Sequence, residues 1–155
     1  MISKPVRTCL DHCEYTTAID INPNYLKPEG MMYRLMKATH EYGAGTATYY
    51  QTTSKSLEIV MELLATMRED CEKLAAGDLH ELMRAWEITH RIWTVESHLR
   101  HIQYRKETRY PGFYYQADYP GQDDENWFCF VNSKYDPKAN KWDVFKRDYI
   151  QIIPD

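Results

Sequence analysis

The sequence contains two helical pairs of metal-binding residues, and neither forms a complete site. Glu87 and His90 have the Glu-x-x-His spacing of di-iron helical bundles, in which both side chains project from one side of a helix. A di-metal bundle needs a second such pair and two more carboxylates, and no second pair is present. His98 and His101 could begin a zinc site, but no third ligand stands at a typical spacing. The favoured interpretation of Glu87 and His90 is a polar pair buried at a helix–helix or domain contact.

Cys9, His12 and Cys13 are soft metal ligands that lie close together near the start of the chain. The second cysteine pair of a zinc ribbon and the cysteine ladder of an iron–sulfur protein are both missing. The sequence also lacks the glycine-rich motifs that bind dinucleotides or phosphates, and the Gly-x-Ser-x-Gly and His-Glu-x-x-His motifs. We therefore expect no catalytic, cofactor-binding or metal-binding residue in this chain.

Charged residues form two neighbouring patches of opposite sign in the second half of the chain. The basic patch consists of Arg100, Arg105, Lys106 and Arg109. The acidic patch consists of Asp118, Asp123, Asp124 and Glu125. The basic patch suits a helix dipole, an anion or an acidic partner, because arginine binds carboxylates and phosphates in a bidentate manner. Internal pairing between the two patches is the outcome that we predict.

The composition is that of an ordinary globular domain. The chain has 155 residues, of which 43% are hydrophobic and 27% charged, and 19 basic against 23 acidic side chains give a net charge of −4. This balance predicts no general attraction to nucleic acid, and no run approaches the ~18 apolar residues of a membrane span. Four cysteines without an export signal predict reduced thiols and a cytoplasmic location.

The elements that position these residues are three predicted helices within one domain. An irregular lead-in over residues 1–27 precedes a helical bundle over residues 28–106. The bundle is predicted to consist of helices over 28–42, 54–76 and 78–106. Ser54 is the expected N-cap of the second helix and Gly77 its C′ residue, and Asp78 with Glu81 has the spacing of a capping box for the third helix.

The third predicted helix carries two apolar stripes. One stripe consists of Leu79, Leu82, Met83, Trp86, His90 and Trp93. The other consists of Ile92, Val95, Leu99 and Ile102. A helix with two apolar stripes is covered on two sides, and two shorter helices supply only one cover. We therefore expect part of this surface to dock on another domain or subunit.

Residues 107–155 form an aromatic and acidic tail that is predicted to contain a β-hairpin. Strands over 127–131 and 142–146 flank a turn at Asp136–Asn140. The tail has more aromatic residues than a small hairpin core can hide, and exposed aromatic patches mark partner sites. The predicted interface residues are Trp93, Arg105, Arg109, Tyr114, Tyr115 and Trp127.

The segment from Glu107 to Trp127 resembles a signature near the C-terminus of succinate dehydrogenase and fumarate reductase flavoproteins. The matching parts are Glu107-Thr108-Arg109, Asp118-Tyr119-Pro120 and Asp123-Asp124-Glu125-Asn126-Trp127. Between them, Tyr110-Pro111-Gly112-Phe113 and Gln116-Ala117 depart from that signature. These departures, and stretches such as Leu79–Trp86, resemble the adenylylsulfate reductase branch of the superfamily. The resemblance extends from about Pro23 to the end of the chain.

The resemblance implies a mainly α fold, a spectrin-repeat-like three-helix bundle with an extended tail. It implies a parent enzyme that converts adenylyl sulfate and two electrons into sulfite and AMP, or catalyses the reverse reaction. FAD would be bound in the parent α subunit, N-terminal to this domain, and two [4Fe–4S] clusters in a β subunit. The implied role of this chain is docking on the flavin domain and near the iron–sulfur subunit, without chemistry of its own.

Two alternatives remain open on the sequence alone. One is a free-standing helical interaction module derived from such a domain. The other is a metal-dependent helical enzyme built on Glu87, His90, His98 and His101.

Overall fold

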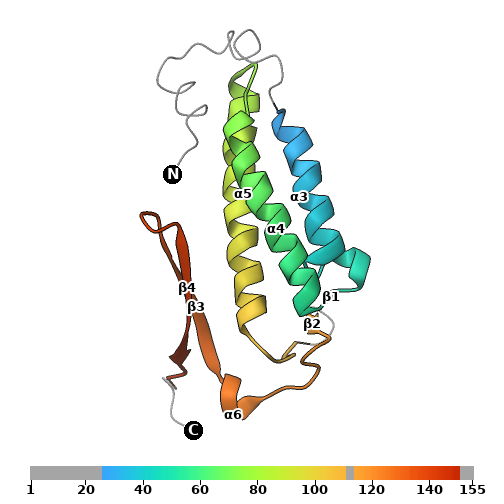
Figure 1. The fold of residues 1–155 in the computed structure, drawn as a ribbon, viewed down its shortest axis with the longest axis vertical. Coiled ribbons are helices and arrows are strands. Elements are labelled where there is room, and N and C mark those ends of the chain that lie inside the picture. The colour runs from blue at the N-terminus through green and yellow to red at the C-terminus, as the bar shows by residue number, and fades with distance from the viewer. Residues whose placement is uncertain (1–25, 111–113, 151–155) are drawn as a thin grey trace.

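The computed structural model describes residues 26–110 and 114–150 as a bundle of three long helices followed by a β-hairpin (Figure 1). The long helices are α3 (Pro28–Tyr42), α4 (Ser54–Asp70) and α5 (Leu79–Tyr104). They lie side by side and alternate in direction (Figure 1). The predicted mainly α fold with a C-terminal hairpin is confirmed. The first 25 residues of the predicted lead-in, with the cysteine–histidine cluster, lie outside the described residues.

Helix α3 has the predicted bounds, because the residues at its ends suit them. Pro28 occupies the first turn, where its fixed φ fits and an N–H is not needed. At the other end, the N–H of Gly43 donates to the helix backbone at 2.9 Å. A Cβ on Gly45 would lie 2.4 Å from the Cα of His40, so glycine alone allows the chain to turn closely here into the 3-10 helix η2 (Thr46–Thr48).

The N-cap of α4 is Thr53, and the prediction of Ser54 was wrong. The Thr53 Oγ1 accepts a hydrogen bond from the Ser56 N–H at 3.1 Å, and the Ser56 Oγ accepts one from the Thr53 N–H at 2.9 Å. This reciprocal pair is a capping box in which serine takes the usual place of glutamate. Ser54 instead donates its N–H to the carboxylate of Asp118 at 2.6 Å, which ties the tail to the start of the helix.

The predicted end of α4 at residue 76 was also wrong, because the helix stops at Asp70. A 3-10 turn, η3 (Cys71–Lys73), follows, and the chain then straightens so that Leu74 bridges Leu26. Two backbone hydrogen bonds, of 2.9 and 3.3 Å, join Leu26 to the residues on either side of Leu74. Leu74 is buried in this extended segment, so its apolar character gave a false helical signal and Gly77 is not a C′ residue.

Helix α5 is continuous over 26 residues, a length of about 39 Å at 1.5 Å per residue. Asp78 is its N-cap, as predicted, and Oδ1 accepts from the Glu81 N–H at 2.7 Å. The Glu81 carboxylate also reaches back, but it accepts from the N–H of Gly77, at 2.7 Å. Both ends of the helix are therefore close to those that the sequence predicted, with the last residue at Tyr104.

The core lies between the three long helices. It includes Met31, Leu35, Leu57, Val60, Leu64, Met67, Ala85, Ile88, Ile92, Leu99 and Ile102. The prediction that Leu79 and Met83 belong to a buried stripe of this helix was wrong, because they are 66% and 52% exposed. The buried stripe of α5 instead continues back from Ile92 through Ile88 and Ala85, at helical steps of three and four. No helix among the described residues has the length and apolarity to cross a membrane.

The tail passes beneath the bundle before it forms the hairpin. A short strand β2 (Tyr115–Gln116) pairs in parallel with β1 (Gln51–Thr52), which precedes α4. The single-turn helix α6 (Asp124–Trp127) follows, with Asp123 as its cap. Trp127 was predicted to begin a strand, but it ends this helical turn, and β3 begins two residues later at Cys129.

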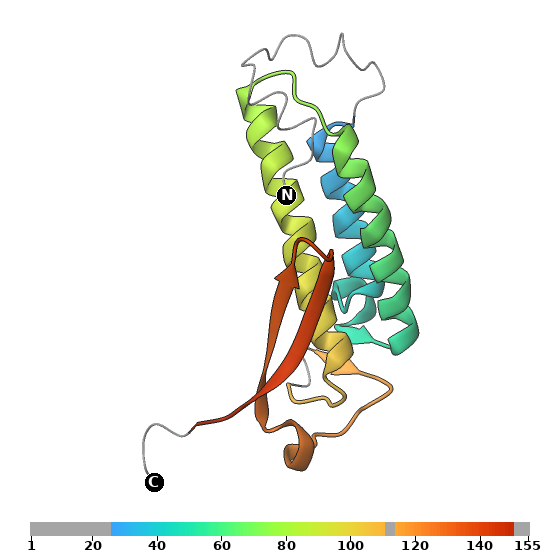
Figure 2. The same ribbon diagram turned by 60° about the vertical axis from the view of Figure 1, so that its left-hand side comes forward.

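The hairpin of β3 (Cys129–Asp136) and β4 (Lys141–Asp148) lies beside α5, on the side away from α3 (Figure 1 and Figure 2). The predicted hairpin is confirmed, with longer strands and with Tyr135 opposite Trp142. These two rings contact Trp93 of α5, with centroid distances of 4.6 Å and 6.1 Å. Three aromatic rings thus form the contact between sheet and helix.

Replacing Ile88 by alanine should lower the free energy of unfolding by about 2–5 kcal/mol, because a fully buried side chain would leave a cavity between the helices. Met83→Ala is the matched control, since Met83 lies on the exposed face of the same helix and should change stability by about 0.5 kcal/mol or less. Urea unfolding followed by circular dichroism measures both. Equal losses would show that the buried stripe is placed wrongly.

Candidate docking site at the junction of bundle and hairpin

The carboxylate of Glu107 is the centre of the junction, and it is fully buried directly after α5. Arg109 donates to both of its oxygens, at 2.8 Å to Oε1 and 3.0 Å to Oε2. Arg105 also donates to Oε1, and the N–H of Asp123 donates to Oε2 at 2.9 Å. A buried carboxylate is costly unless it is paired and hydrogen-bonded, and here four donors satisfy it.

The environment of Glu107 sets its ionisation. Burial by itself would raise the pKa of Glu107, but the hydrogen bonds from Asp123, Arg109 and Arg105 outweigh it and hold the pKa below the ordinary value. Glu107 is therefore a fixed negative charge at neutral pH. It holds two arginines in place, Arg105 at the C-cap of the helix and Arg109 beyond it.

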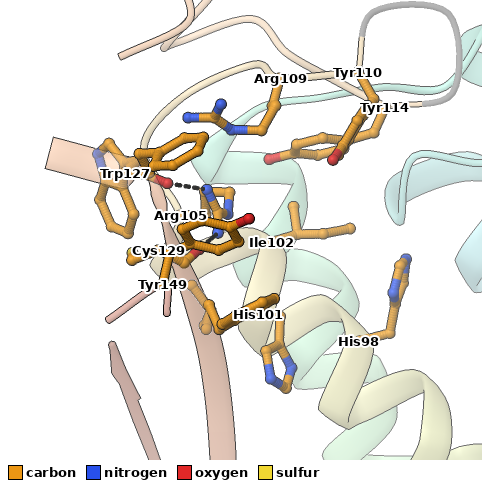
Figure 3. A pocket seen from close by; sticks show the side chains of 13 residues that line it. His98, His101, Ile102, Arg105, Arg109, Tyr110, Tyr114, Trp127, Cys129 and Tyr149 are labelled. Carbon is orange, nitrogen blue, oxygen red and sulfur yellow. Dashed lines mark hydrogen bonds between the residues drawn. The ribbon is translucent and has the colours of Figure 1, made fainter. Parts of the chain in front are cut away.

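Arg105 joins the end of α5 to the start of the hairpin. Its guanidinium donates to the backbone carbonyl oxygens of Trp127 and Cys129, both at 2.9 Å (Figure 3). Since a guanidinium has several donors in one plane, it can satisfy Glu107 and both carbonyls together. A single side chain thus fixes where α6 ends and where β3 begins.

Trp127 is the buried aromatic residue of this junction and is only 9% exposed. Tyr104 contacts its ring edge to face, with a centroid distance of 5.8 Å. The Lys146 Nζ lies 3.7 Å from the ring centroid, and the Arg105 guanidinium carbon lies 5.6 Å from it. These contacts connect α5, α6 and β4 through one side chain.

The predicted pairing between basic and acidic patches occurs at one position. Arg109 pairs with Asp124 at 2.7 Å. Arg100 instead pairs with Glu96 of its own helix, and Asp118 accepts from the N–H of Ser54. Arg100, Arg105 and Arg109 are therefore held mainly by two buried carboxylates, those of Glu96 and Glu107. The sequence predicted neither of these pairings.

A groove of about 600 Å3 opens beside this network (Figure 3). Helix α5 contributes His98, His101 and Ile102 to its wall, and Arg105 and Arg109 line it after the helix. Most of the remaining lining is aromatic, with Tyr110, Tyr114, Trp127, Phe128, Phe130 and Tyr149. The groove is thus largely apolar and carries a few nitrogen groups from arginine and histidine, which is typical of a binding surface.

The structure places the predicted interface residues in internal contacts. Trp93 lies between α5 and the hairpin, with the Arg68 guanidinium carbon 4.1 Å from its ring centroid. Tyr114 packs against the core and donates its hydroxyl to Gln116 Oε1 at 2.9 Å, and burial raises its pKa. Tyr115 is half-buried in β2. Their role in an interface remains a prediction.

The most exposed aromatic residues of the tail are ones that the prediction passed over. They are Tyr110, Phe128, Phe130, Phe145 and Tyr149, with exposed fractions from 41% to 68%. Phe128 and Phe130 both contact Tyr149, with centroid distances of 5.1 Å and 6.0 Å. Strand alternation could have identified Phe130 and Phe145, because they face away from Tyr135 and Trp142 on the paired strands.

The metal hypotheses gain no geometric support from the described part of the chain. Glu87 and His90 are both exposed, so the expectation of a buried polar pair was wrong. Glu87 lies 3.7 Å from Arg91, and the His90 ring lies against Trp86. Residues 26–110 and 114–150 contain no group of three or more His, Cys, Asp or Glu side chains that could hold a metal ion.

The chain is similar to known adenylylsulfate reductases, although no family model matches it. Adenylylsulfate reductase subunit alpha of Megalodesulfovibrio gigas is 54% identical over 134 residues, which are 86% of this chain and 20% of that subunit. The structure of adenylylsulfate reductase from the hyperthermophilic Archaeoglobus fulgidus superposes with a TM-score of 0.85 at 51% sequence identity. The match includes 97% of this chain and 23% of the Archaeoglobus chain. A structure of adenosine-5-phosphosulfate reductase in complex with sulfite gives the same values.

Fold and junction together define a mainly helical domain that carries a docked hairpin with an exposed aromatic face. The chain is homologous to a part of the adenylylsulfate reductase alpha subunit. It spans about a fifth of the length of the relatives that it matches.

Glu107→Gln should lower the free energy of unfolding at neutral pH by about 3 kcal/mol, because the half-buried Arg105 and Arg109 would lose their counter-charge. Since the pKa of Glu107 is lower in the folded state than its ordinary value of 4.5, its ionisation stabilises the fold above about pH 4.5, and this contribution is lost as the pH falls through the lower folded-state pKa. The difference in the free energy of unfolding between wild type and variant should therefore narrow on acidification. Urea titrations at several pH values measure it, with the exposed Glu125→Gln as control. A gap that stays constant would contradict the role of Glu107.

Proposed function

We propose that this chain is the helical docking domain of the alpha subunit of an adenylylsulfate reductase. The observation that carries the proposal is the identity of 51–54% to alpha subunits of which the chain covers only about a fifth. A domain of this size within a larger subunit must pack on the remainder. The parent reaction would convert adenylyl sulfate and two electrons into sulfite and AMP, or run in reverse, with the chemistry located outside this domain and the enzyme in the cytoplasm.

The exposed aromatic face of the tail supports a docking role. Tyr110, Phe128, Phe130 and Tyr149 border one groove and are each about half or more exposed. A group of exposed aromatic residues beside a groove is typical of surfaces that pack on a partner, because aromatic rings dominate the energy of interfaces. These residues would make the direct contacts, and Arg105 would hold the hairpin that presents them.

Two partners follow from the family resemblance. The flavin-binding part of the same alpha subunit would be the first, and it would carry the FAD. An iron–sulfur β subunit with two [4Fe–4S] clusters would be the second.

The test is co-expression of this chain with an Archaeoglobus fulgidus alpha subunit from which the matching region has been removed. The two should co-purify, because the removed region would leave an apolar surface that this chain covers. Phe128→Ser/Phe130→Ser should weaken the complex, and Tyr33→Ser, on the exposed face of α3, is the control outside the groove. Purified alone, the chain should show no flavin absorbance.

A monomeric chain that fails to bind the truncated subunit would favour the free-standing interaction module instead. Stoichiometric flavin in the purified chain would also refute the proposal, because the chemistry would then lie within this domain.

A further inference from the structure

A second groove, of about 470 Å3, lies on the junction between the end of α5 and strand β4. We call it the basic groove, and the side chains relevant here are Arg100, Tyr104, Lys106, Trp127, Val144 and Lys146. Three of them are cationic, and none of its lining residues is a carboxylate. This is a local excess of positive charge on a chain that has 23 acidic against 19 basic side chains.

Two of the three cations have no carboxylate partner within the described residues. Arg100 is already paired with the buried Glu96 at 2.7 Å. The Lys146 Nζ donates to a backbone oxygen at 2.8 Å and lies over the Trp127 ring, while the Lys106 Nζ is 5.7 Å from the Tyr119 ring centroid. None of the ion pairs among residues 26–110 and 114–150 includes either lysine. Their charge is therefore available to a ligand.

We propose that the basic groove binds an acidic segment of a partner polypeptide. Lys106 and Lys146 would pair with its carboxylates, and the half-buried rings and methyl groups of Tyr104 and Val144 would contact its apolar side chains. The proposal goes beyond the docking function above, because it concerns a different groove and holds for any partner with this charge.

Nucleic acid fits the groove less well than an acidic peptide does. Binding of single strands relies on open aromatic faces for stacking, but Trp127 is only 9% exposed and Lys146 occupies its face.

The test uses fluorescence anisotropy with the full chain and a labelled peptide of alternating Glu and Leu. Wild type should bind this peptide, more weakly as salt is raised, and should not bind the same peptide with Lys in place of Glu. Lys106→Glu/Lys146→Glu should weaken binding on the order of tenfold. The matched control, Lys138→Glu/Lys141→Glu, changes the same charge in and beside the hairpin turn and should leave binding unchanged.

Lys106→Glu alone guards against a folding defect, because the ring of Tyr119 is the one partner of its side chain among residues 26–110 and 114–150, and this variant should still weaken binding. Equal losses in groove and control variants, no binding by wild type, or preference for a labelled single-stranded oligonucleotide would each overturn the proposal. A wild-type dimer that the groove variant separates would assign the acidic segment to a second copy of this chain and overturn the assignment to a partner polypeptide.

Discussion

The pairing of Glu107 with Arg105 and Arg109 is the interaction on which the arrangement of the tail depends. A two-stranded hairpin by itself is marginally stable, so its position must be fixed by the structure that it contacts. Arg105 provides this by binding the buried carboxylate and the carbonyl oxygens of Trp127, at the end of α6, and Cys129, at the start of β3. The cost of burying the Glu107 charge is offset because both of its oxygens are hydrogen-bonded and paired with arginine.

A second buried carboxylate fixes the other end of the hairpin in the same way. Glu96, 2% exposed within α5, accepts from Arg68 of α4 and from Arg100. Arg68 also donates to Asn140 in the hairpin turn at 2.9 Å and covers the ring of Trp93. The hairpin is thus held at one end by Arg105, which pairs with Glu107, and at the other end by Arg68, which pairs with Glu96. Its outer face, with Phe130 and Phe145, remains exposed.

The sequence predicted the elements better than the details of the site. Asp78, Glu81 and Pro28 have local effects on helix ends, and local patterns are visible in sequence. Leu74 was misassigned because its partner, Leu26, is distant in the chain. The role of Glu107 was missed for the same reason, since the N–H of Asp123 reaches its carboxylate, and the carbonyl oxygens of Trp127 and Cys129 reach its partner Arg105, only after folding. Trp93 and Trp127 were predicted as interface residues, and that role stays a prediction. Their neighbours, and hence their burial, depend on how the hairpin docks.

Hydrogen exchange of the hairpin amides tests most directly whether Arg105 fixes the hairpin on the bundle. Arg105→Lys retains the charge but cannot reach Glu107 and both carbonyl oxygens at once. The amides of β3 and β4 should then exchange faster than in wild type, while those of α4 keep their protection. Arg147→Lys, on the exposed part of β4, is the matched control and should change neither. Unchanged protection of the hairpin in Arg105→Lys would contradict the account.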